Sequence, residues 1–572
     1  MTESVQNKLE WSSRFVFIMA CVGGAVGLGN IWMFPYKAGT NGGGAFVLIY
    51  IAAVMLLALP VCIAELMIGR RGGGGPPNAI ARVAIESGHT KHWRWMGVIL
   101  AGVGAVFALS FYSVVGGWTV AFAAKTVTGQ ISGLEANQII NLFDELNGNP
   151  VELYTWFCVF IGMTVYISSR GLHKGLEQAV RLMMPALFVM LIMTVFYAAI
   201  IGDFAAALSF LFTPDFSKVD TQIVMTAFGQ AFFSVSVGLT NLVAYGAYLK
   251  KEVNIPESAT IICGADSLVA ILAGLAVFPI IFANGIEPSS GPGLVFQALP
   301  LAFAQTSGGL IFGALFFILL FFAALTSSIA MIEAPVSWLC DETKLSRRMS
   351  ALTVGAVGFI LGSMAALSFN VFSDIRPLGG IAMFSDKGFF DMFATIASDI
   401  IMPLGGLMIA LFSGWIVKRK YSLEELFENK NSHIHAIWLF LVRYFAPFLL
   451  SGEADAIMCG SAITQAREKQ FLYSKPYAYF NESVLIRSED QFEKPEDFRN
   501  KTLGAIHEST NMALAQKWQE CQYRAFDGTS DNVFKEMIDA LINKEIDGVV
   551  DDEPARGVGL RHFLDVVPVA VE

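Results

Sequence analysis

Charged residues are scarce in this chain. Only 15% of its 572 residues are Asp, Glu, Lys or Arg, whereas 55% are hydrophobic, and the mean hydropathy is +0.57. This composition excludes an ordinary soluble enzyme and indicates a protein that crosses a lipid bilayer several times. The net charge of -10 comes without a basic patch or a run of aromatic and basic residues, so we expect no nucleic-acid partner.

Residue patterns typical of catalysis and redox chemistry are missing as well. The seven cysteines are scattered, and none stands at a Cys-x-x-Cys or Cys/His spacing that suggests a metal or redox site. No nucleophile–base pair or P-loop is visible, so we expect neither an enzyme nor a cofactor. The N-terminus lacks a charged region followed by a cleavage site, so the first apolar run is expected to be retained.

Ten apolar segments of spanning length precede residue 420. They cover about residues 12–38, 44–70, 93–127, 154–169, 178–201, 222–248, 257–284, 308–342, 346–370 and 388–417. Basic residues gather at the ends of the even-numbered segments, for example Arg70 and Arg347, and the opposite loops are acidic. The positive-inside rule then predicts a cytoplasmic N-terminus in a multi-pass protein of the inner (plasma) membrane.

Two of these segments carry residues that interrupt a helix. The first contains the stretch Gly23–Pro35, with four glycines and a proline, and the sixth contains Ser236, Gly238 and Thr240. A spanning helix is broken only where the freed backbone groups line a cavity or a polar site. Broken first members of two five-helix halves predict an inverted-repeat transporter. The alternative is a glycine-rich face that packs helices together.

Several motifs carry a resemblance to a known family. They are AVGLGNIW at 25–32, NGGGAF at 41–46, GQAFFSVSVG at 229–238, GPGLVF at 291–296 and FFAALTSSIA at 321–330. With these motifs, about residues 8–450 resemble the neurotransmitter:sodium symporter family and its bacterial leucine transporter. The resemblance implies an all-α polytopic membrane domain over residues 1–450, with ten or eleven helices in a 5+5 inverted repeat.

The same resemblance implies two sites for sodium as the coupling ion. One would use the carbonyl oxygens of Gly23, Val26 and Ala323 with the hydroxyls of Thr326 and Ser327. The other would use Ala25, Asn30, Ser234 and Asp266. Hard oxygen ligands suit sodium, and Asp266 stands where relatives have an anion-linked ligand. For Thr326 and Ser327 the alternative is a pair of packing hydroxyls that bond to their own helix.

A substrate pocket is implied beside these ions. The amides of Leu28 and Gly29 would face a carboxylate, together with the Tyr112 hydroxyl, and Phe233 would cover the pocket. Carbonyl groups around Ser234 and Ser236 would take the ammonium group, and the side-chain end would be lined by Ala108, Leu239 and Met331. The family's amine transporters have an aspartate where this chain has Gly27, so the substrate should bring its own carboxylate.

The implied gates depart from the family pattern. On the cytoplasmic side Lys8 replaces an arginine, with Trp11, Tyr248 and Asp341 retained. On the external side Met33 replaces an arginine opposite Asp391, so an arginine–carboxylate fork cannot form there. Either Lys387 substitutes or that gate closes by packing alone. Glu65, an acid inside the second segment, is expected to hydrogen-bond the broken first helix.

The composition changes in the last part of the chain, residues 451–572. Residues 436–450 are apolar but short for a span, and strands are predicted at 501–506 and 546–550 with a helix at 529–543. The tail resembles part of an amino-acid-binding periplasmic solute-binding protein of family 3, through DAIMCGSAIT, LGAIHEST and DGVVDDEPA. The ligand residues so implied are Thr464, Arg467, Ser509, Thr510 and Asp552. The alternative is a plain cytoplasmic tail.

Two functions follow as hypotheses. The first is a sodium-coupled symporter that takes up a neutral apolar or aromatic amino acid by alternating access. The second is an amino-acid sensor that binds its ligand and signals through the C-terminal domain without coupled flux. The partial tail is expected to lack high-affinity binding of its own. The side of the membrane on which it lies and the oligomeric state stay open.

Overall fold

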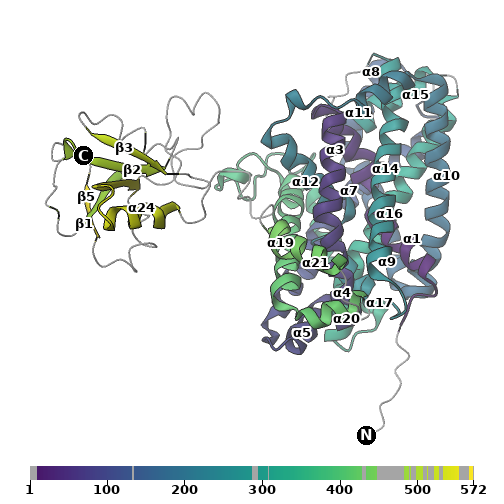
Figure 1. The fold of residues 1–572 in the computed structure, drawn as a ribbon. Coiled ribbons are helices and arrows are strands. Elements are labelled where there is room, and N and C mark those ends of the chain that lie inside the picture. Colours follow the sequence, from purple (N-terminus) through teal and green to yellow (C-terminus); the bar gives the residue numbers. More distant parts are fainter. Residues whose placement is uncertain are drawn as a thin grey trace, which may run out of the picture. The chain divides into compact units, whose positions relative to one another are not determined.

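The structure is a computed structural model. It describes residues 9–131, 134–285, 294–306, 308–427 and 433–447, and in the C-terminal part residues 482–487, 490, 498–506, 512, 521–526, 533–552 and 566–570. The chain divides into two compact units, Met1–Asp455 and Ala456–Glu572. Figure 1 shows the first unit as a bundle of long helices and the second as a sheet with a helix.

The helices of the first half correspond to the first five predicted segments and their connections. They are α1 (Arg14–Ala25), α2 (Phe34–Thr40), α3 (Gly44–Ala53), α4 (Leu59–Gly72), α5 (Pro76–Glu86), α6 (Arg94–Gly97), α7 (Ala105–Val127), α8 (Ala136–Gly148), α9 (Pro150–Ser169), α10 (Gln178–Ile201) and α11 (Phe204–Phe212). Short π-helical stretches continue several of them, such as Gly29–Met33 before α2.

The helices of the second half hold the remaining five segments. They are α12 (Thr221–Val235), α13 (Asn241–Gly246), α14 (Ile255–Ala283), α15 (Leu299–Gln305), α16 (Gly309–Glu342), α17 (Arg347–Leu367), α18 (Phe389–Ala394), α19 (Met402–Leu411), α20 (Arg419–Phe427) and α21 (His433–Phe440). A π-helical stretch, Thr395–Ile401, joins α18 to α19.

Eight helices in the described residues are long and apolar enough to cross a membrane, and nine if one bent pair counts as a span. The bent pair is α1 with Gly29–Thr40, which meet at 50°. The sixth predicted segment is missing from that count because its break leaves α12 and α13 too short on their own. The broken first and sixth helices predicted from the sequence are therefore confirmed.

The break between α12 and α13 has an unusual backbone. Ser236, Gly238 and Thr240 all have positive φ, at 57°, 92° and 60°. At Gly238 a side chain would also collide with the carbonyl oxygen of Met402 on α19. Glycine is therefore needed at this position for both its φ and its close contact with α19.

The second unit is a small α/β domain. Its described elements are β1 (Glu482–Arg487), β2 (Thr502–Ile506), β3 (Gln522–Phe526), α24 (Val533–Ile542), β4 (Gly548–Asp552) and β5 (Val566–Ala570). The sheet order is β3-β2-β4-β1-β5; β2 runs parallel to β3 and β4, and β1 runs antiparallel to β4 and β5. The predicted strands and helix of the tail thus coincide with β2, β4 and α24.

Candidate functional site

The break in the first helix brings oxygen atoms of α1 next to α16. The hydroxyl of Ser327 lies 3.3 Å from the carbonyl oxygens of both Gly23 and Val26. It is 2% exposed and belongs to a different segment, 301 residues further along the chain than Val26. Ser327 therefore reaches across to the broken helix instead of bonding to its own backbone.

The neighbouring hydroxyl has a different environment. Thr326 donates to the carbonyl oxygens of Phe322 and Ala323, at 3.0 and 3.1 Å, in the manner of a packing threonine. A Cβ on Gly23 would nevertheless lie 3.3 Å from the Thr326 side chain, so the two segments touch here. The five groups predicted for one sodium site, those of Gly23, Val26, Ala323, Thr326 and Ser327, are thus assembled between α1 and α16.

A second buried polar cluster joins the π-helical stretch Gly29–Met33 to α3, α12 and α14. Asn30 donates through Nδ2 to Ser234 Oγ at 2.8 Å and to Asp266 Oδ1 at 2.7 Å, and Ser234 Oγ donates to Asp266 Oδ2 at 2.5 Å. Tyr50, which the sequence analysis did not single out, lies 3.1 Å from the Ser234 hydroxyl. All four side chains are fully buried.

This cluster offers the oxygen chemistry that a cation requires. It contains a carboxylate, a serine hydroxyl and the Asn30 amide, whose oxygen accepts from the Gly27 amide at 3.1 Å and would face the cluster after a rotation by half a turn. Ala25, the fourth predicted ligand, ends α1 and carries one of the carbonyl groups that the break releases from the helix. The structure therefore brings together the residues of the second predicted sodium site as well.

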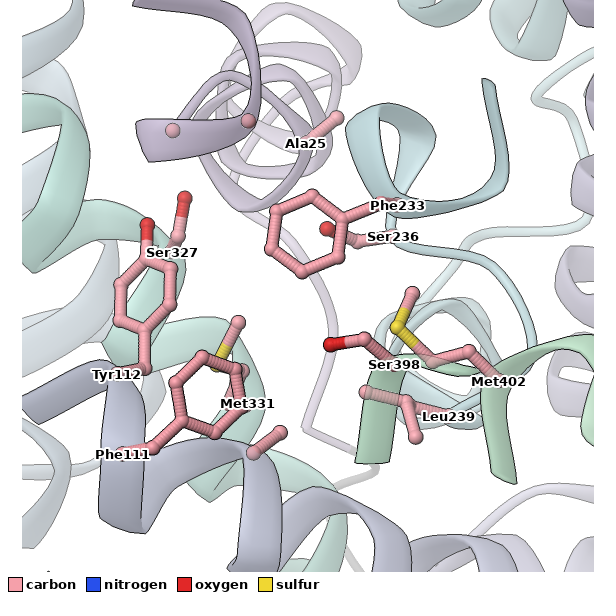
Figure 2. Close-up of a pocket in the computed structure, with 13 residues that line it drawn as sticks. Ala25, Phe111, Tyr112, Phe233, Ser236, Leu239, Ser327, Met331, Ser398 and Met402 are labelled. Atoms are coloured by element: carbon pink, nitrogen blue, oxygen red, sulfur yellow. The ribbon is translucent and has the colours of Figure 1, made fainter. Parts of the chain in front are cut away.

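A cavity lies between the two helix breaks (Figure 2). Its lining includes seven of the eight predicted substrate residues, namely Gly29, Ala108, Tyr112, Phe233, Ser236, Leu239 and Met331. The eighth, Leu28, does not line it, but its backbone amide donates to the Tyr112 hydroxyl at 3.2 Å. Ala25, Gly27 and Ser327 also reach the lining, so the cavity adjoins the predicted ion sites.

Three further lining residues were missed by the sequence analysis. Phe111 follows from its place next to Tyr112, but Ser398 and Met402 belong to the tenth segment, for which no pocket role was predicted. Their spacing of four residues puts them on one helical face, and this was the only available signal. The cavity thus has a wall from the tenth segment opposite Tyr112 and Ser327 (Figure 2).

Glu65 does not bond to the first broken helix as expected. Its Oε1 accepts a hydrogen bond of 2.7 Å from the amide of Gly238 in the sixth segment, and the carboxylate also faces the amides of Leu242 and Val243. These amides belong to the break and to the first turn of α13, where no carbonyl of the same helix is available. A carboxylate at a helix N-terminus is stabilising, so Glu65 holds α13 in place.

The residues predicted for the cytoplasmic gate lie partly within the described residues. Trp11 is buried, and its Nε1 donates to the carbonyl oxygen of Tyr245 at 3.0 Å while its amide donates to that of Tyr248. Asp341 accepts from the amide of Gly75 at 2.5 Å, beside the start of α5. Lys8 lies outside the described residues.

An unpredicted ion pair lies at the same end of the bundle. Glu333 on α16 is fully buried and accepts from both terminal nitrogens of Arg347 on α17 and, at 2.9 Å, from the Tyr248 hydroxyl. Arg347 also donates to the carbonyl oxygen of Ser168 at 3.1 Å. The pair therefore ties α9, α16, α17 and the end of the sixth segment together.

Replacing Arg347 by alanine is expected to lower the free energy of unfolding by about 3–5 kcal/mol, because it leaves the Glu333 carboxylate buried and unpaired. Replacing both residues by apolar ones of similar size should cost much less. The measurement is thermal unfolding in detergent, with the exposed neighbour Arg348→Ala as the matched control. Equal melting temperatures for the Arg347 and Arg348 variants would contradict this reading of the pair.

The predicted external gate contains no arginine–carboxylate fork among its described residues. Met33 is half-buried, and Asp391 is exposed and lies near Lys387 and Arg376. Lys387 donates to the Thr395 hydroxyl at 2.7 Å. A second acid, Asp399, faces Lys37 of α2 and Lys387. Lys387 therefore lies near both acids, in line with one of the two alternatives predicted for this gate.

The predicted ligands of the tail fall mostly outside the described residues. This applies to Thr464, Arg467, Ser509 and Thr510. Asp552 is the last residue of β4.

Comparisons with known proteins agree with this architecture. The model of the sodium:neurotransmitter symporter family matches residues 8–144 and 138–486. An uncharacterized sodium-dependent transporter, YhdH, of Bacillus subtilis is 37% identical over 450 residues, which are 78% of this chain and 97% of the relative. An uncharacterized sodium-dependent transporter of Haemophilus influenzae is 32% identical over 458 residues, or 79% and 98% of the two chains.

A solved structure is similar as well. The crystal structure of MhsT in complex with L-phenylalanine superposes with a TM-score of 0.71 at 36% identity, covering 77% of this chain and 98% of MhsT. The broken helices and the cavity between them are consistent with the family to which these matches point. The chain belongs to the sodium:neurotransmitter symporter family.

Proposed function

We propose that this protein uses the sodium gradient to take up a neutral amino acid with an apolar or aromatic side chain, by alternating access. The observation that carries the proposal is the cavity between the two helix breaks. At one end it has Ser327 and Tyr112 beside the break of α1, and its other end is lined mainly by apolar side chains such as Leu239 and Met331. The polar end suits the charged groups of such an amino acid, and the apolar end suits its side chain.

The polar end favours a substrate that carries its own carboxylate. A Cβ on Gly27 would lie 2.7 Å from the Tyr112 hydroxyl and closer still to that of Ser327. No acidic side chain fits at this position, and none lines the cavity within the described residues. The Tyr112 hydroxyl and the amides at the break are donors, which suit a carboxylate at a helix N-terminus.

Sodium as the driving ion is supported by the two oxygen-rich clusters. Each adjoins the break in α1, and together they offer carbonyl, hydroxyl, amide and carboxylate oxygens, the ligands of hard cations. The names of the bacterial relatives contain "sodium-dependent transporter", and MhsT was solved with L-phenylalanine. We place the bundle in the plasma membrane with its N-terminus in the cytoplasm, an orientation that the basic ends of the even-numbered segments favour.

The test is uptake into proteoliposomes. Radiolabelled L-phenylalanine should accumulate only with an inward sodium gradient, and preloaded vesicles should exchange label in counterflow. The alternative hypothesis, a sensor, binds amino acid but does not exchange it across the membrane. Binding without counterflow would therefore reject the symporter and favour the sensor.

Removing the second unit should leave transport intact. We propose that Ala456–Glu572 is a partial α/β domain, similar to a family 3 solute-binding protein, without high-affinity binding of its own. A chain ending at Asp455 keeps both ion clusters and the cavity, so its sodium-driven uptake should stay within about twofold of the full chain. Uptake lost in the truncated chain, at equal levels of membrane-inserted protein, would show that the tail takes part in transport.

A further inference from the structure

The side-chain end of the cavity holds one polar group that the apolar pattern did not predict. Ser398 lies in the π-helical stretch Thr395–Ile401, and Figure 2 shows its hydroxyl oxygen pointing into the cavity. Its lining neighbours on the same wall are Leu239 and Met402, both apolar. Single π-helical turns inside α-helices occur frequently at functional sites.

The hydroxyls of the lining differ in their hydrogen bonding. Tyr112 accepts from the Leu28 amide at 3.2 Å, Ser236 donates to the Gly24 carbonyl at 3.2 Å, and Ser327 contacts two carbonyls of α1. Within the part of the chain that the structure describes, Ser398 is the only lining hydroxyl without a hydrogen-bond partner in the protein. Three of the four lining hydroxyls are thus hydrogen-bonded within the protein.

A helical serine normally satisfies its hydroxyl on the preceding turn. Ser113 and Ser363 do so here, donating over 2.7 Å to the carbonyl oxygens of Leu109 and Phe359, four residues earlier. In the π-helical stretch the backbone bonds instead span five residues, as from the Met402 amide to the Ala397 carbonyl. Within this stretch Ser398 makes no such bond to the preceding turn, and its hydroxyl is left for a ligand.

We propose that Ser398 hydrogen-bonds a polar group on the ring of an aromatic substrate, so that the transporter distinguishes tyrosine from phenylalanine. The inference rests on the proposed function and names its substrate more closely. Ser398 lies across the cavity from Tyr112 and Ser327, which face the amino-acid end, so it meets the far end of the side chain. A serine hydroxyl can both donate to a phenol and accept from it.

The size of the effect follows from one neutral hydrogen bond. A bond of this kind contributes a net 0.5–1.5 kcal/mol in typical cases. Deleting the Ser398 hydroxyl should therefore lower kcat/KM for L-tyrosine, relative to L-phenylalanine, by about two- to twelvefold. Phenylalanine has the same shape but no hydroxyl, so its uptake should change little.

The experiment measures sodium-driven uptake of both amino acids in the same proteoliposomes, for the full-length protein and for Ser398→Ala. The ratio of the two kcat/KM values does not depend on how much variant is inserted. Ser413→Ala is the matched control, because Ser413 is a buried serine of the same span outside the cavity lining. Its ratio should equal that of the unmodified protein.

Two results would overturn the proposal. One is an unchanged tyrosine-to-phenylalanine ratio in Ser398→Ala, and the other is an equal shift in Ser413→Ala. Both leave sodium-driven uptake of amino acids standing, so they refute only the role of Ser398. If the unmodified protein takes up neither amino acid with a sodium gradient, the proposed function fails and this inference fails with it.

Discussion

Replacing Thr326 and Ser327 together by alanine is expected to reduce sodium-driven uptake at least 100-fold. The Ser327 hydroxyl lies between two carbonyl oxygens of the broken first helix, and Thr326 stands beside the carbonyl of Ala323. A hydrogen bond to a charged group contributes about 1.5–3 kcal/mol, and a hydroxyl–cation contact in a buried site is of similar size. Losing two such ligands weakens ion binding by roughly two to four powers of ten.

The measurement is the initial rate of L-phenylalanine uptake into proteoliposomes at increasing sodium concentration. Ser337→Ala on the same helix is the control, because that serine bonds to the carbonyl of Ala334 and lies outside both ion clusters. It should retain the normal sodium dependence. Full activity of the unmodified protein in a sodium-free buffer with only a proton gradient would refute the assignment of sodium.

Asp266→Ser is expected to make transport depend on chloride, whereas the unmodified protein should transport equally well in chloride and in gluconate. The Asp266 carboxylate is fully buried and bonds to Asn30 and Ser234, two other groups of the predicted ion site. A fixed negative charge at this place balances the charge of a cation in a medium of low dielectric constant, where an unpaired ion is costly. Without it, a dissolved anion has to supply the charge.

The chloride test compares the two buffers for each variant. In gluconate the uptake rate of Asp266→Ser should fall by more than about 90%, a tenfold change that corresponds to about 1.4 kcal/mol. In chloride part of this uptake should return. Asp220→Ser is the control, since Asp220 is an exposed residue that caps α12 and serine caps a helix as well. Chloride dependence in the unmodified protein would show that the Asp266 carboxylate does not fulfil this role.

The two helix breaks could be predicted because their signal is local. Four glycines before Pro35, and the polar run from Ser234 to Asn241, are incompatible with a straight apolar helix whatever surrounds them. The positions of Asn30, Tyr112 and Ser327 followed from the resemblance of their motifs. In the structure Asn30 and Ser327 contact residues at the break of the first helix, and Tyr112 and Ser327 line the cavity.

Other features depend on contacts between distant segments and could not be predicted. Glu65 was assigned to the wrong broken helix, because nothing in its own sequence indicates which break offers free amides to it. Ser398 lies in the π-helical stretch Thr395–Ile401, and its place in the cavity lining depends on how the tenth segment packs against the sixth, which the sequence pattern does not indicate. The partner of Glu333 is fourteen residues away, at the start of another helix, beyond the reach of helical spacing.

The backbone between α12 and α13 has an energetic consequence. Ser236 and Thr240 hold left-handed conformations without being glycine, and Thr240 is β-branched, for which such a conformation is especially unfavourable. Each residue of this kind costs about 1–3 kcal/mol, which the contacts of Glu65 and α19 with Gly238 must offset in the conformation seen here. Where this strain is relieved on the way out of the conformation, the activation barrier for leaving it is lower. In the proposed alternating-access cycle, relief of this strain would favour movement of the sixth helix, so Ser236 and Thr240 would affect the rate of that movement through their backbone conformations.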